Sequence, residues 1–106
     1  MADDVEIWVV AGIYQARSGR EAELGAVLAQ YVVLTRGVRG CRNVDLVASA
    51  STPGKLLVVE KWDDADAQRA HLDDPVMVDM ATAATPLLAS APDLDLYEAI
   101  SAHDLE

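Results

Sequence analysis

Residues 5–16 restrict the fold more than any other part of the sequence, because this segment is apolar on both faces when it is written as a β-strand. One face would carry Val5, Ile7, Val9, Ala11 and Ile13, and the other Trp8, Val10, Gly12 and Tyr14. A strand of a small antiparallel sheet usually keeps one face wet. Two dry faces therefore predict a different cover on each side of the sheet.

Two segments with helical periodicity interrupt the strand pattern. The first begins at Ser18 or Gly19, ends at residues 37–40, and has an apolar stripe formed by Leu24, Val27, Leu28, Tyr31 and Leu34. The second is capped by Asp63 or Asp64 and broken at Pro75. Its stripe continues up to Pro92 with Met77, Met80, Ala81, Ala84 and Leu87 or Leu88.

Three further strands are predicted. Residues 41–48 and 55–62 form a hairpin through the turn signal Pro53-Gly54, and residues 94–100 alternate as a last strand before a loose tail at residues 101–106. The order β-α-β-β-α-β is that of the ferredoxin-like α+β fold, with a four-stranded antiparallel sheet. We expect a single domain over residues 1–106, with a core of about residues 5–101.

This topology places both helices on one face of the sheet, so the other face would be an exposed apolar surface in a monomer. Soluble proteins avoid large surfaces of this kind. We expect two sheets to pair face to face in a homodimer that forms a dimeric α/β barrel.

Charge and composition exclude several classes of partner. The chain has 18 acidic and 8 basic residues, for a net charge of -10, which opposes binding to nucleic acid or to an anionic membrane surface. No apolar run approaches the ~20 residues of a membrane span, and residues 1–6 do not resemble a secretion signal, so the expected location is the cytoplasm. Cys41 is the only cysteine and reads as a packed hydrophobe, with a reactive thiol as the alternative.

A set of landmarks recurs in order along nearly the whole chain. They are the valine-rich first strand, Gly19-Arg20-Glu21, Gly40-Cys41, Pro53-Gly54, Glu60-Lys61-Trp62, and Ala70-His71-Leu72 followed by Pro75. With these landmarks the sequence resembles the antibiotic biosynthesis monooxygenase family, whose members are dimeric α+β barrels. The resemblance implies an enzyme that needs no metal, haem or flavin, so no cofactor is expected.

The same resemblance implies a small aromatic substrate, quinol-like or polyketide-like, that is oxidised by dioxygen. Members that act on polycyclic anthrones have an asparagine, a tyrosine and an arginine where this chain has Val58, Gln68 and Ala81. Haem-degrading members have a histidine and an asparagine at positions that resemble Ala81 and Gly12. These departures argue against polycyclic anthrones and against haem as substrates.

Three residues are the candidate catalytic groups. His71 is a possible base, or a histidine that caps the broken helix or bonds a backbone carbonyl. Trp62 is either a pocket wall or a core anchor. Glu60 is a base if its strand face is dry, or else it forms a salt bridge with Arg17 or Arg42. Candidate substrate-binding residues are Trp8, Tyr14, Asn43, Val58, Met77 and Met80.

Three functions remain open at this point. The leading hypothesis is a cofactor-independent monooxygenase with Trp62 as a wall and His71 or Glu60 as the base. The alternatives are a non-catalytic dimeric module that binds a small metabolite, and another reaction on the same scaffold, such as isomerisation or decarboxylation. The sequence contains no phosphate loop, nucleophile elbow or histidine-carboxylate metal spacing that would favour a different chemistry.

Overall fold

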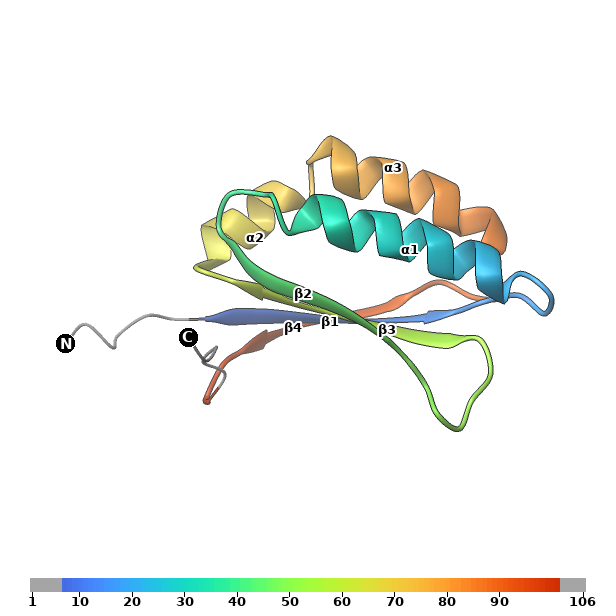
Figure 1. Cartoon of the computed structure of the whole chain (residues 1–106). Coiled ribbons are helices and arrows are strands. Elements are labelled where there is room, and N and C mark those ends of the chain that lie inside the picture. Colours follow the sequence, from blue (N-terminus) through green and yellow to red (C-terminus); the bar gives the residue numbers. More distant parts are fainter. Residues whose placement is uncertain (1–6, 102–106) are drawn as a thin grey trace.

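The computed structural model describes residues 7–101, which form one four-stranded sheet and three α-helices (Figure 1). The elements are β1 (Trp8–Gln15), α1 (Glu21–Thr35), β2 (Cys41–Ala48), β3 (Lys55–Trp62), α2 (Ala65–His71), α3 (Pro75–Ala84), the 3-10 turn η1 (Thr85–Leu87) and β4 (Asp93–Glu98). The strand order is β2-β3-β1-β4, and every neighbouring pair is antiparallel. The predicted ferredoxin-like α+β fold is confirmed.

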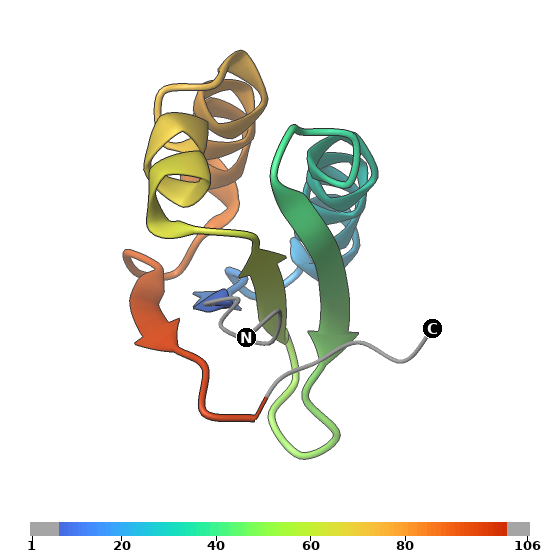
Figure 2. The same cartoon turned by 90° about the vertical axis from the view of Figure 1, so that its left-hand side faces the viewer.

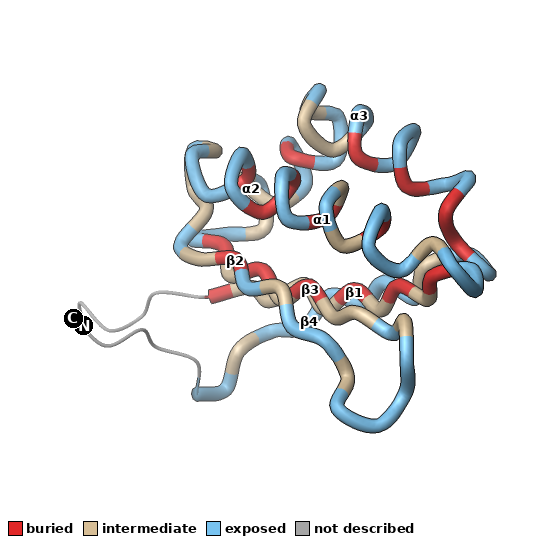
Figure 3. Tube along the Cα trace, turned by 45° about the vertical axis from the view of Figure 1, so that its right-hand side comes forward, coloured by how far each residue is buried: buried red, intermediate tan, exposed pale blue. Residues whose placement is uncertain are grey.

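All three helices lie on the same face of the sheet, with α1 on the β2 side and α2 and α3 on the β4 side (Figure 2). The core fills the space between these two layers, where the buried residues gather in Figure 3. Leu24 and Leu28 of α1 belong to the same cluster as Val44 and Val58 of the sheet and Met80 of α3. The apolar stripes of the helices thus meet one face of the strands, as their periodicity requires.

The hairpin between β2 and β3 has the predicted bounds. Gly54, in the Pro53-Gly54 turn, has a φ of 76°, a left-handed conformation that glycine adopts without strain. The register then places Val44 opposite Glu60 and Leu46 opposite Val58. These pairs lie on the face that the helices cover.

Helix α1 departs from the prediction at its start and on its buried face. Ser18 and Gly19 lie in a turn, because Gly19 has a φ of 85°, and the helix begins at Glu21. The buried positions include Leu24, Leu28, Tyr31 and Thr35, so Leu34 falls outside the stripe and is 48% exposed. The predicted placement of Leu34 in the core is wrong.

The break in the second helical segment is confirmed. Asp64 caps α2 by accepting a hydrogen bond from the backbone N–H of Ala67 at 2.8 Å, and Asp74 caps α3 by accepting one from Val76 at 3.0 Å. Pro75 is the first residue of α3. Proline is tolerated there because a backbone N–H at this position would have no acceptor within the helix. As a result His71 is the last residue of α2, and its side chain is buried.

The second face of the sheet carries a row of apolar residues that no described helix or strand covers (Figure 1). They are half-buried at Val9, Ala11, Ile13, Leu57 and Val59. We call this surface the open face. Val5, which the sequence also placed here, lies outside the described residues, as does most of the predicted tail.

Strand β4 is the least buried part of the sheet. All of its residues are exposed (Figure 3), and it ends at Glu98. The predicted last strand therefore extends too far, since Ile100 lies beyond β4 and is fully exposed.

Candidate functional site

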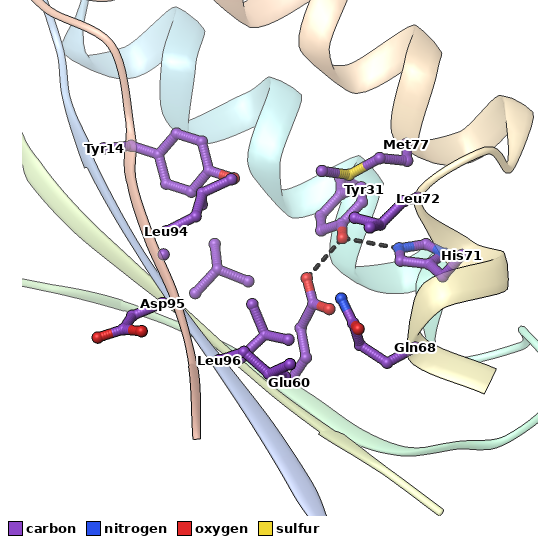
Figure 4. A pocket seen from close by; sticks show the side chains of 13 residues that line it. Tyr14, Tyr31, Glu60, Gln68, His71, Leu72, Met77, Leu94, Asp95 and Leu96 are labelled. Carbon is purple, nitrogen blue, oxygen red and sulfur yellow. Dashed lines mark hydrogen bonds between the residues drawn. The ribbon is translucent and has the colours of Figure 1, made fainter. Parts of the chain in front are cut away.

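A cavity of about 150 Å³ lies on the helix-covered side of the sheet, beside α2 and β4. Figure 4 shows that three buried polar side chains meet at this cavity: Tyr31 from α1, Glu60 from β3 and His71 from the end of α2. We call it the Glu60 pocket. Most of its remaining lining is apolar, with Val10, Val58, Leu72, Met77, Leu94 and Leu96 among the residues involved.

Glu60 lies in the middle of the sheet, opposite Val10 of β1 and Val44 of β2, and is only 6% exposed. One carboxylate oxygen, Oε2, accepts a hydrogen bond from the Tyr31 hydroxyl at 2.5 Å, and the other, Oε1, accepts one from Nε1 of Trp62 at 3.0 Å. Each oxygen of this buried carboxylate therefore has a hydrogen-bond donor.

The salt bridge that the sequence left open for Glu60 is not formed within residues 7–101. Nε of Arg17 instead donates to the backbone oxygen of Leu88 at 2.9 Å, and Arg42 contacts Asp63 at 3.1 Å. Neutral donors, and not an arginine, therefore satisfy the buried carboxylate.

His71 completes this network from the other side of Tyr31. Its Nε2 lies 2.8 Å from the Tyr31 hydroxyl, and its ring centroid lies 4.8 Å from that of Trp62 with a 37° tilt. Burial lowers the pKa of His71, although the charges of Glu60 and Asp74 oppose this effect. The imidazole is therefore neutral at neutral pH.

The hydrogen bonds of Tyr31 assign the tautomer of His71. Because the Tyr31 hydroxyl gives its one proton to Glu60, its oxygen accepts from the N–H at Nε2 of His71. Nδ1 then carries no proton, and it is buried without a hydrogen-bond partner in the described part of the chain. The alternatives of a capping histidine or a bond to a backbone carbonyl do not describe this arrangement.

Tyr31 is the member of this cluster that the sequence reasoning missed. Its position on the apolar stripe of α1 reads as core, and the residue is indeed only 2% exposed. Burial and the charge of Glu60 raise its pKa, so the hydroxyl stays protonated and remains a donor. The available signal was Glu60 itself, since a buried carboxylate needs donors and the buried face of the facing helix offers the hydroxyls of Tyr31 and Thr35.

The other predicted site residues fall into two groups. Tyr14, Val58 and Met77 line the Glu60 pocket, and burial together with the charge of Glu60 raises the pKa of Tyr14 to about 12. The remaining four do not line it. Trp62 is fully buried behind Glu60 and His71, Met80 lies farther along α3, Trp8 is at the start of β1, and Asn43 bonds Asp45 on the opposite sheet face.

Several residues at the mouth of the pocket carried no clear signal in the sequence. Leu94 and Leu96 of β4 are 48% and 45% exposed although they face the helices, and Leu72 follows α2. Gln68 adds an amide beside Glu60 (Figure 4). The pocket therefore has a polar inner end and an apolar, partly open outer side.

Residues 7–101 contain no helix long and apolar enough to cross a membrane and no group of three His, Cys, Asp or Glu residues placed to bind a metal ion. Cys41 is half-buried, and burial, together with the charge of Glu60, raises its pKa to about 11. Its sulfur is therefore a thiol at neutral pH.

Comparison with known proteins bears on the family and the fold of the chain. The model of the antibiotic biosynthesis monooxygenase family matches residues 7–83. No curated protein matches the chain. The solved structure of Rv0793 from Mycobacterium tuberculosis is similar, with 22% identity and a TM-score of 0.85, over 92% of this chain and 99% of that one.

Two further solved structures, which carry the same family name, are also similar. The protein from Deinococcus radiodurans has 26% identity and a TM-score of 0.83, over 93% of this chain and 98% of that one. The protein from Caulobacter crescentus has 20% identity and a TM-score of 0.83, over 92% of each chain. The family match confirms the resemblance seen in the sequence, and the chain belongs to the antibiotic biosynthesis monooxygenase family.

Proposed function

We propose that this protein is a cofactor-independent monooxygenase that uses dioxygen to oxidise a small quinol-like or polyketide-like aromatic in the Glu60 pocket. Membership of the family supports a monooxygenase-like role. The observation that carries the proposal is a buried carboxylate, Glu60, in the lining of a largely apolar cavity of about 150 Å³. A cavity of this size holds a single benzene ring, which favours a small aromatic over a polycyclic one.

The first step is proton transfer. Glu60 accepts the proton of a phenol or enol hydroxyl, so that an O–H bond of the substrate breaks and the carboxylate becomes a carboxylic acid. The resulting anion is electron-rich enough to give one electron to dioxygen. The substrate radical and superoxide then combine, which forms a carbon–oxygen bond.

Water loss completes the reaction. The peroxide takes back the proton from Glu60, and the hydroperoxide loses water from a carbon that still carries a hydrogen, which leaves a carbonyl. One oxygen atom of dioxygen enters the product and the other leaves as water, so the four electrons that dioxygen gains are those that the substrate loses. Glu60 ends the cycle ionised.

The residues around Glu60 hold its carboxylate in place. Tyr31 and Trp62 fix its two oxygens, and His71 orients the Tyr31 hydroxyl. Because their protons are given to Glu60, Tyr31 and Trp62 are positioning residues, although Tyr31 also lines the pocket. His71 is the second candidate base, because its Nδ1 has no hydrogen-bond partner in the described part of the chain. The apolar wall limits the access of water to the reactive anion.

We also propose that the working form is a homodimer in which the open face of each sheet is covered by a second copy. The half-buried row from Val9 to Ile13 on β1, together with Leu57 and Val59 on β3, supports this, because it is continuous across two neighbouring strands. The two sheets would then pack with their apolar faces together.

Oxygen uptake tests the proposed reaction. A panel of quinols, phenols and anthrones is offered to the wild type, to Glu60→Gln, and to Glu98→Gln as a control on the exposed strand β4. We expect uptake with single-ring compounds, a loss of about 10²-fold or more in Glu60→Gln, and no change in Glu98→Gln. If none of these compounds causes oxygen uptake by the wild type, the proposal is overturned. If the wild type nevertheless binds such compounds, the non-catalytic binding module is favoured.

A further inference from the structure

A second cavity, of about 130 Å³, lies beside the Glu60 pocket along α3. We call it the tail cavity. Tyr14, Met77 and Leu94 line both cavities, so the two spaces share part of their wall. Figure 4 shows Tyr14 and Leu94 on the side of the Glu60 pocket that is away from His71, whereas Met77 lies above Tyr31 and Leu72. The two cavities are thus neighbours that meet at three shared residues.

The partition between the cavities is able to move. Leu94 is half-exposed on the edge strand, and the side chain of Met77 is flexible. Gly12 lies next to this partition, where a Cβ would stand 2.8 Å from Cδ2 of Leu94 and 3.0 Å from Cε1 of Tyr14. A side chain at Gly12 would therefore press on Leu94 and Tyr14, two of the residues that the cavities share.

The two cavities differ in chemistry. The Glu60 pocket contains a buried carboxylate, whereas the tail cavity is lined mainly by alanine, methionine, leucine and proline side chains. Its polar groups are the Tyr14 hydroxyl and Thr85, and the Thr85 hydroxyl already donates to the backbone oxygen of Ala81 at 2.6 Å. A ligand that spans both spaces therefore needs a polar end and an apolar end.

We infer that the tail cavity binds an apolar substituent of the same molecule whose hydroxyl lies at Glu60. The substrate class is then a single-ring phenol or quinol that carries a short alkyl chain. This inference rests on the proposed function for the position of the hydroxylated ring. Binding requires no oxidation, so the subsite can be tested apart from the reaction.

The test is calorimetric binding without dioxygen, with phenol and with 3- and 4-alkylphenols that carry ethyl, butyl or hexyl chains. In the better of the two series we expect affinity to rise about three- to fourfold for each added methylene and then to level off when the cavity is full. Ala81→Leu fills the tail cavity from an exposed position on α3. Ala83→Leu is the matched control, because Ala83 is exposed on the same helix but is not among the residues that line the tail cavity.

Ala81→Leu should abolish the gain with chain length and leave the affinity for phenol unchanged, while Ala83→Leu keeps the gain. A wild type whose affinity does not depend on chain length overturns the inference. A gain in affinity with chain length that survives in Ala81→Leu also overturns it, since the alkyl chain then lies outside the tail cavity. A ligand that shows the expected gain but causes no oxygen uptake in air supports the tail cavity and counts against the proposed oxidation.

Discussion

The two faces of the sheet use the same strands in different ways. On β3, Val58 and Glu60 point to the helices and are almost fully buried, whereas their neighbours Leu57 and Val59 lie on the open face and are half-buried. The helix-covered face is completed within one chain and contains both cavities. The open face has equally apolar residues but no cover among the described elements. One strand thus serves an internal core and, by our proposal, an interface between copies.

The largest expected effect comes from a charge on the covered face. Val58→Asp places an unpaired carboxylate at a site that is 2% exposed, beside the carboxylate of Glu60. We expect the free energy of unfolding to fall by more than ~4 kcal/mol, which leaves the chain largely unfolded. Circular dichroism and denaturant titration measure this. A folded Val58→Asp with near wild-type stability would contradict the assignment of this face to the core.

The same substitution one residue later tests the other face. Val59→Asp should leave each chain folded, because Val59 is only half-buried, but should weaken the proposed homodimer by about 10²-fold or more. Sedimentation velocity over a range of concentrations measures the dimer, and circular dichroism checks the fold. A wild type that stays monomeric at every concentration removes the proposed interface altogether.

The contrast between the faces could be read from the sequence, because it depends only on alternation along single strands. The two dry faces of residues 5–16, the hairpin at Pro53-Gly54 and the break at Pro75 were all local patterns, and the fold they predicted is confirmed. The errors lie at the ends of elements. The start of α1 depends on the left-handed Gly19, and the end of β4 depends on the pairing with β1.

The candidate site was less predictable because it is assembled across elements. Glu60, Trp62 and His71 stood out by residue type, but the contact that joins Glu60 to His71 comes from Tyr31, on a helix that reads as ordinary core. The exact rotation of α1 decides which stripe residue reaches the sheet, and periodicity does not resolve it. Trp62 is separated from the pocket by its packing against Glu60 and His71, which is also a contact between elements.

A smaller effect on stability is expected when the buried hydroxyl of Tyr31 is removed. Tyr31→Phe removes a donor to Glu60 and the acceptor for Nε2 of His71, and it leaves both groups buried. We expect a loss of ~1–3 kcal/mol in the free energy of unfolding. Tyr97→Phe is the matched change on the open face, where the ring is half-exposed, and should cost less than ~0.5 kcal/mol. Equal effects of the two changes in denaturant titration would show that the Tyr31 network adds nothing to stability.

The free energy of unfolding should also depend on pH, because His71 is buried on the covered face. Burial lowers its pKa below the ordinary value of 6.5, so the unfolded chain binds a proton more readily than the folded one. The stability that this group contributes is complete above pH 6.5 and is lost as the pH falls through the lower folded pKa. His71→Gln has an amide that can still donate to Tyr31 but does not titrate there. The difference in unfolding free energy between the two proteins should change across this window, and a constant difference would mean that His71 is not held neutral.

The smallest expected effect is on ligand affinity, and it distinguishes Gly12 from its neighbour Ala11 on β1. Gly12→Ala adds a methyl group 2.8 Å from Cδ2 of Leu94, which is half-exposed and can turn away, and 3.0 Å from Cε1 of the buried Tyr14, which must shift slightly. The methyl group still narrows the junction between the two cavities, so the affinity for 4-butylphenol should fall a few-fold while that for phenol changes less. Ala11→Ser, on the open face, should change neither affinity. Calorimetry with the two ligands measures this, and an unchanged preference for the longer ligand in Gly12→Ala would place the alkyl chain outside the junction.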